Sequence, residues 1–72
     1  MPMSPEKRKF YTFRNWSIYQ VNGMIKMLKK MQTKAHDFDN SEICDTTHEM
    51  SYALEHIQDL HDELSRLTFP EE

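Results

Sequence analysis

The chain has 72 residues, a formal net charge of −3, 38% hydrophobic and 29% charged residues, one glycine and one cysteine. Because Cys44 is the only cysteine, an intramolecular disulfide is excluded and a reducing compartment is favoured. The sequence has no apolar core of a signal peptide and no run of 18 apolar residues, so we expect a cytoplasmic protein without a membrane partner.

Charge is sorted between the two halves of the chain. Residues 1–34 carry eight lysines and arginines against one acid, a net charge of +7. Residues 35–72 carry eleven acids against Arg66, a net charge of −10. Attraction between the halves therefore favours a fold in which they lie side by side, and disfavours packing between halves of the same charge.

Residues 1–14 are expected to form a basic and aromatic N-terminal arm or a short extra helix. Ser4, Pro5 and Glu6 have the form of a helix N-terminus. The run from Phe10 to Phe13 suits a strand as well as a helix. The cations of this arm are candidate nucleic-acid contacts: Lys7, Arg8, Lys9 and Arg14.

The next segment has apolar residues at spacings of three and four, which predict a first helix over about residues 15–37. In our heptad assignment, positions a and d hold Val21, Met24, Leu28, Met31, Ala35 and Phe38. Ile18 and Ile25 widen this stripe on one side and Met27 widens it on the other. Among the residues that face away, six form the candidate partner-binding face: Trp16, Tyr19, Asn22, Lys26, Lys29 and Lys30.

A turn over residues 38–41 leads into a second predicted helix over about 41–67. Asp39, three residues before Glu42, predicts a capping box at its start. The helix is indicated by a heptad repeat of Ile43, Met50, Ala53, Ile57, Leu60, Leu64 and Leu67. Because the turn is short, we expect an all-α, antiparallel two-helix hairpin over residues 15–69, followed by a tail at 70–72. A chain this small buries only about 60% of its unfolded surface, so assembly as a dimeric four-helix bundle is expected.

The acidic half offers no convincing catalytic or metal site. His56 with Asp59 and Glu63 is the best ligand set, but no two histidines have the spacing that one helix face requires. Cys44 and His48 are four residues apart, yet nothing supplies an oxyanion hole or a pocket. We therefore expect no enzyme activity, metal, cofactor or small-molecule substrate.

The outer face of the first helix begins with aromatic residues and ends with lysines, and it has a structural and a functional interpretation. In the structural interpretation, its lysines serve solubility while Trp16 and Tyr19 pack on the arm or on a second copy in a dimer. The functional one is a small, non-catalytic regulatory protein that binds and modulates another protein through this face. The alternative is a dimeric helical-hairpin RNA-binding regulator that uses the same face together with the basic arm. The acidic balance favours the protein partner.

Two antiparallel helices in about seventy residues, with Ile43-Cys44 and His48 just after the turn, resemble the Rop family of plasmid RNA-binding proteins. The resemblance covers fewer than a dozen residues, and no functional residue is transferred from it. It implies a dimeric four-helix bundle that contacts RNA through the outer face of the first helix. The chain departs from the family by carrying the additional arm before the hairpin.

Overall fold

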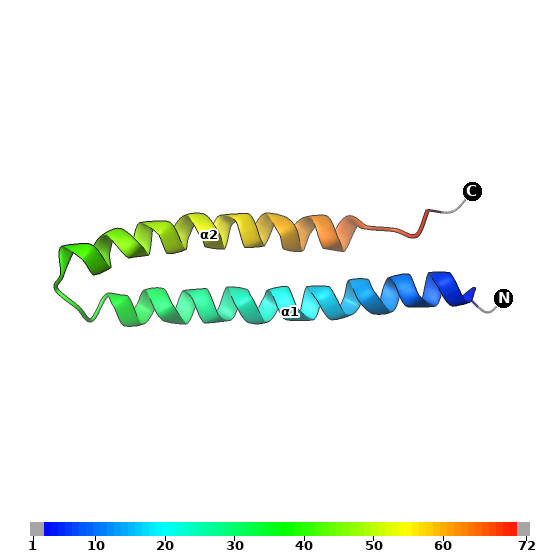
Figure 1. The fold of residues 1–72 in the computed structure, drawn as a ribbon, viewed down its shortest axis with the longest axis horizontal. Coiled ribbons are helices and arrows are strands. Elements are labelled where there is room, and N and C mark those ends of the chain that lie inside the picture. Colours follow the sequence, from blue (N-terminus) through cyan, green and yellow to red (C-terminus); the bar gives the residue numbers. More distant parts are fainter. Residues whose placement is uncertain (1–2, 71–72) are drawn as a thin grey trace.

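The computed structural model describes residues 3–70, which form two helices joined by a short turn (Figure 1). Helix α1 spans Pro5–Ala35 and helix α2 spans Ser41–Arg66, and the part of the chain that the structure describes contains no strand. The two helices run antiparallel and pack against each other. The predicted all-α hairpin is therefore confirmed. Residues 1 and 2 of the expected arm and residues 71 and 72 of the expected tail lie outside the described residues.

Helix α1 begins ten residues earlier than the predicted first helix. The Ser4 side chain accepts a hydrogen bond from the Lys7 N–H at 3.2 Å, Pro5 occupies the first turn and Glu6 places an acid beside the helix N-terminus. This start signal is sufficient to keep the run from Phe10 to Phe13 helical. The described part of the arm is therefore the N-terminal end of one continuous helix.

Helix α2 is capped by a different residue from the one that the sequence predicted. Asn40, not Asp39, caps α2: its Oδ1 accepts hydrogen bonds from the N–H groups of Glu42 at 2.9 Å and Ile43 at 3.3 Å. Asp39 lies one residue too early to reach these donors in the same way. Helix α2 otherwise begins where it was predicted and ends at Arg66, one residue before the predicted end.

The contact between the helices uses only one side of the predicted apolar stripe. Val21, Ala35 and Leu64 are the buried hydrophobic residues. The half-buried positions that continue this contact along α1 are Ile18, Ile25, Leu28 and Gln32. The residues assigned to heptad position d are not buried by this contact, since Met24, Met31 and Phe38 are all exposed.

This shift has a physical reason in the shape of α1. Its apolar residues extend to both sides of Val21 and Leu28, and one neighbouring helix covers only one of the two sides. The side that faces α2 carries Ile18 and Ile25, and there Gln32 Nε2 donates a hydrogen bond to Ser51 Oγ at 2.8 Å. The methionine side is left uncovered.

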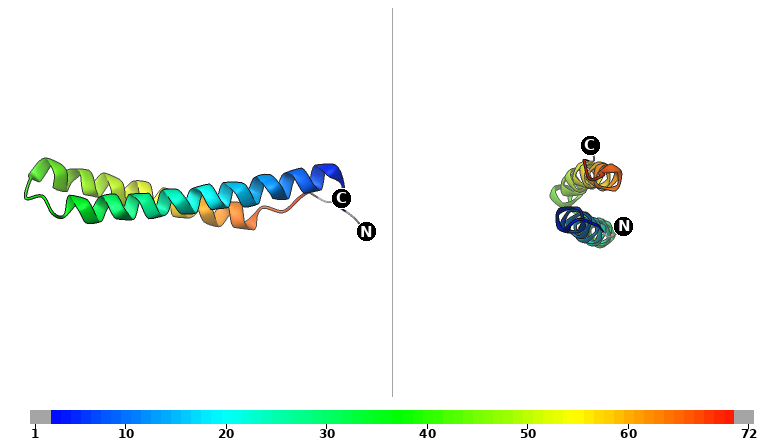
Figure 2. Two further views of the ribbon diagram at one scale, coloured as in Figure 1. Left: turned by 90° about the horizontal axis from the view of Figure 1, so that it is seen from below. Right: turned by 90° about the vertical axis from the view of Figure 1, so that its right-hand side faces the viewer.

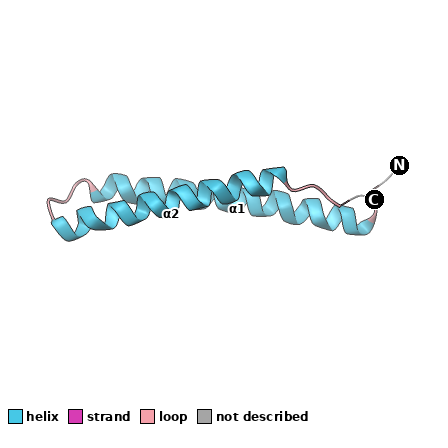
Figure 3. Ribbon diagram, turned by 90° about the horizontal axis from the view of Figure 1, so that it is seen from above, coloured by secondary structure: helices cyan, strands magenta, loops and turns pink. Residues whose placement is uncertain are grey.

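Beyond α2, residues 67–70 form an extended segment, here called the C-terminal strap, which leaves the helix as a loop (Figure 3). It is held against the first turns of α1. Arg14 Nη1 donates a hydrogen bond to the Leu67 carbonyl at 2.9 Å, and the Phe69 N–H donates one to Tyr11 Oη at 3.2 Å. The rings of Phe10 and Phe69 meet edge to face at 5.8 Å. The strap thus covers part of the length by which α1 exceeds α2.

The molecule is a long, thin rod. Its principal extents are 59 × 17 × 11 Å, and the two helices form a single layer when viewed end on (Figure 2). The radius of gyration is 17.3 Å, whereas a compact domain of this length has about 11 Å. Both long faces of the hairpin are therefore open.

Candidate interaction surfaces

The six residues of the predicted partner-binding face lie on different sides of α1. Trp16 lines a hollow between the helices together with Phe13, Met24, Leu60 and others. Asn22 lines a hollow on the opposite side of the hairpin, with Gln58 and His61 of α2. The predicted face is therefore not a single surface, and Trp16 separates from the rest.

The remaining five residues form what we call the outer strip: Tyr19, Asn22, Lys26, Lys29 and Lys30. Tyr19, Asn22 and Lys26 line one shallow hollow on the back of α1 with Gln20 and Gly23. The Tyr19 side chain is 74% exposed, the largest value among the exposed large hydrophobic residues of the described chain. Within residues 3–70 none of the three lysines forms an ion pair with a carboxylate of its own chain.

A second surface, here called the apolar groove, runs between the helices on the side of Trp16. It consists of two hollows of about 390 and 520 Å³ that share Gln20 and Met24. Its apolar walls and floor are made by Phe13, Trp16, Val21, Met24, Met27 and Leu28 of α1 and by Ala53, Ile57, Leu60 and Leu64 of α2. Its remaining lining residues are Ser17, Gln20 and Gly23.

The four cations proposed as nucleic-acid contacts are not equivalent. Besides its bond to the strap, the Arg14 guanidinium lies 5.1 Å from the centre of the Tyr11 ring, and its Nε is buried without a hydrogen-bond partner. Arg14 is therefore held by contacts within the hairpin, and its assignment to nucleic acid stays a prediction. Lys7 is half-buried and has a partner within the structure. Arg8 and Lys9 are exposed.

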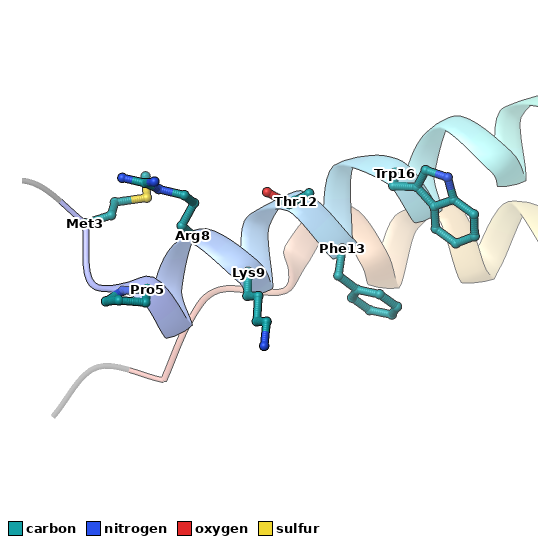
Figure 4. A pocket seen from close by; sticks show the side chains of 7 residues that line it. All are labelled: Met3, Pro5, Arg8, Lys9, Thr12, Phe13 and Trp16. Carbon is teal, nitrogen blue, oxygen red and sulfur yellow. The ribbon is translucent and has the colours of Figure 1, made fainter.

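Arg8 and Lys9 border a further hollow of about 520 Å³ on the first turns of α1, lined also by Met3, Pro5, Thr12, Phe13 and Trp16. The two cations point to different sides of the helix, with Lys9 on the side of Phe13 (Figure 4). Two diverging charges do not make a continuous track for a phosphate backbone, which needs several cations along one path.

The acidic helix α2 carries the residues that the sequence offered for catalysis or metal binding. Cys44 and His48 are both exposed, and neither lines one of the hollows described above. In the described part of the chain, no group of three His, Cys, Asp or Glu side chains is placed to hold a metal ion. None of the described helices combines the length and the apolar character that crossing a bilayer requires.

The apolar groove was not predicted as a separate surface, although the spacing of residues along α1 indicates it. Five apolar residues and one glutamine recur at helical spacing along α1 and form a second stripe beside the one that contacts α2. They are Phe13, Trp16, Gln20, Met24, Met27 and Met31. The heptad assignment merged the two stripes into one. The groove becomes visible only when α2 is known to cover Ile18 and Ile25.

Comparison of the chain with protein-family models, with curated proteins and with solved structures gives no match. The likeness to the Rop family therefore stays one of architecture: a helical hairpin is shown, and membership of a family is not.

Proposed function

We propose that this chain is a small, non-catalytic, self-associating helical protein that regulates another protein by binding an acidic patch on it through the outer strip. The observation that carries the proposal is the placement of Tyr19, the most exposed of the large hydrophobic residues, among Lys26, Lys29 and Lys30. These lysines have no acidic partner in the described part of their own chain. Self-association occupies the other surface, the apolar groove.

The outer strip has the composition of a protein-binding surface. Tyrosine is enriched among the residues that dominate binding energies, because it buries a large ring and loses little conformational entropy. The lysines add long-range attraction for an acidic surface and raise the rate of encounter. All five residues stand on one uninterrupted helix, so little additional ordering is needed on binding.

A protein partner is favoured over RNA by the charges around the strip. The chain carries −3 overall, and α2 brings seven acids against one arginine alongside α1. These acids repel a phosphate backbone. Arg14 is committed to the strap, so the basic arm contributes fewer free cations than an RNA-binding surface would use.

The proposal is tested with a matched pair of tyrosine variants. Tyr19 lies on the outer strip, whereas Tyr52, which is 59% exposed on α2, lines neither the strip nor the groove. A photo-cross-linking side chain at position 19 identifies the bound macromolecule in extracts of cells that produce the protein. Its affinity for the purified chain is then measured for wild type, Tyr19→Ala and Tyr52→Ala.

We expect Tyr19→Ala to weaken binding by about tenfold or more, and Tyr52→Ala to leave it unchanged. Replacing the three lysines of the strip by glutamine should slow association and reduce its dependence on salt. Equal affinities of the two tyrosine variants would refute the assignment of the strip. Cross-linking to RNA, with an affinity that falls steeply as salt rises, would select the RNA-binding alternative instead.

A further inference from the structure

The hairpin exposes more surface than a compact chain of its mass. Its accessible surface is 6146 Å², and the mass is 8.7 kDa. A folded monomer of this mass exposes about 4,700 Å², so the excess is about 1,400 Å². A standard protein interface takes about 800 Å² from each partner. The surplus is therefore large enough for one stable interface.

The apolar part of this surplus is concentrated in the apolar groove. Met24, Met27 and Leu60 are exposed along its walls, while Val21 and Leu64 form its floor. The end-on view in Figure 2 shows the two helices as one layer, so no other element of the described chain covers the groove. An exposed apolar surface of this length on a small domain marks an interaction site.

We propose that a second copy of this chain covers the apolar groove with its turn at the same end of the rod, so that α1 of each copy lies on α2 of the other. This inference rests on the self-association in the proposed function and adds the surface and the orientation. Charge complementarity favours a second copy as the occupant of the groove. Helix α1 carries eight cations and one acid, and α2 carries seven acids and one cation.

Two copies related by a two-fold axis can pack groove against groove in two ways, and the charges of the helices favour one of them. With the turns at the same end, each basic α1 meets an acidic α2. With the turns at opposite ends, α1 meets α1 and α2 meets α2, so like charges face each other along the whole bundle. Only the same-end arrangement places a helix of opposite charge against each helix.

One residue pair locates this contact. The hydrogen bond between Gln32 and Ser51 fixes two positions of α1 and α2 at the same height along the rod. Two residues closer to the turn on each helix lie Lys34 and Glu49. Lys34 follows Met27 by seven residues and Glu49 precedes Ala53 by four, so both lie on the groove side of their helices. In the same-end arrangement, Lys34 of each copy meets Glu49 of the other.

The first experiment tests the groove. Sedimentation equilibrium of the full chain across the micromolar range is compared for wild type, Met27→Glu and the control Tyr52→Glu. Met27 is 64% exposed in the hairpin, so its replacement strains the single chain little, whereas a dimer would bury two unpaired carboxylates. We expect the dissociation constant to rise at least about a hundredfold for Met27→Glu and to stay near wild type for Tyr52→Glu.

The second experiment tests the orientation by mixing two variants. Lys34→Glu alone and Glu49→Lys alone each place like charges opposite one another in the same-end homodimer. A mixture of the two variants restores both opposite-charge pairs between the chains, although it restores none within a chain. We expect each variant to dimerise roughly tenfold or more weakly than wild type, and the mixed heterodimer to recover most of this loss.

The native cysteine gives an independent measurement of the same orientation. Cys44 is exposed near the turn, so a spin label there reports whether the turns lie together. Labels on a same-end dimer are separated only by the width of the bundle, about 20–25 Å. Opposite ends would place them about 40 Å apart along the rod.

Three results would overturn the proposal. A wild-type chain that stays monomeric and cooperatively folded at all concentrations removes the dimer. A Met27→Glu variant that dimerises as well as Tyr52→Glu removes the groove as the interface. A mixture that recovers nothing, together with a long distance between labels on Cys44, removes the same-end orientation. Failure of Tyr19→Ala to affect a macromolecular partner would refute the outer strip and leave these three measurements unaltered.

Discussion

Leu60 and Leu64 form a matched pair that measures how much of α2 is covered in solution. They lie one helical turn apart and line the same hollow, but Leu64 is 9% exposed in the hairpin and Leu60 is 45% exposed. Substituting alanine removes the same atoms at both positions and changes helix propensity equally. The difference between the two losses of stability therefore depends on burial.

The expected magnitudes follow from the exposed fractions. Leucine to alanine costs about 2–5 kcal/mol at a fully buried site, and we take the lower part of this range because both sites border open space. Leu64→Ala should then cost about 2.5 kcal/mol per chain. Leu60→Ala should cost about 1.5 kcal/mol if the hairpin is alone, because nearly half of its side chain is already in water. A second copy over the groove raises the cost of Leu60→Ala to about 2.5 kcal/mol per chain.

The assay is unfolding in urea, followed by far-ultraviolet circular dichroism at two protein concentrations. For a dimer, the unfolding midpoint of wild type rises with concentration, and the two variants lose similar amounts of free energy of unfolding. A midpoint that is independent of concentration, together with a Leu60→Ala cost well below that of Leu64→Ala, would refute a covered groove.

Three further predictions concern the hairpin itself. Asn40→Ala should lower the free energy of unfolding by about 1 kcal/mol because α2 loses its cap, whereas Asp39→Ala should lower it less; equal losses in thermal melts would contradict the assignment of the cap. Gly23→Ala should raise the free energy of unfolding by about 0.8 kcal/mol and the melting temperature by several degrees, because an added Cβ meets no atom of its own chain within 4 Å; a lower melting temperature would show that the second copy over the groove packs closely against this position. Arg14→Met should cost about 1–2 kcal/mol and speed hydrogen exchange at the Phe69 amide, because the strap loses its hydrogen bond and the ring stacking at its base; unchanged exchange would show that the strap does not depend on Arg14.

Much of the fold was predictable because each helix carries its own local signals. The spacing of Ile57, Leu60 and Leu64 placed α2 to within a residue or so at both ends. The start of α1 was also encoded, in Ser4 and Pro5, but the aromatic run that follows fits strand and helix alike. Local preference cannot resolve that ambiguity, since contacts with the distant Phe69 help to hold the run in place.

The surfaces were harder to predict than the helices. Ile25 and Met24 are both apolar and adjacent in sequence, so the pattern alone does not say which of them meets α2. That choice depends on the register of the two helices, to which Gln32 and Ser51 contribute a cross-helix hydrogen bond that no periodicity reveals. The heptad assignment also grouped Trp16 with the outer strip, whereas the structure places Trp16 in the lining of the groove.

In the proposed same-end dimer, the position of the outer strip relative to the groove would set how many target molecules bind. Tyr19 lies on the back of α1, away from the groove, and a two-fold axis along the rod would send the two copies of this strip to diagonally opposite corners. One target molecule would then not reach both strips. We expect such a dimer to join two target molecules, with one bound at each corner.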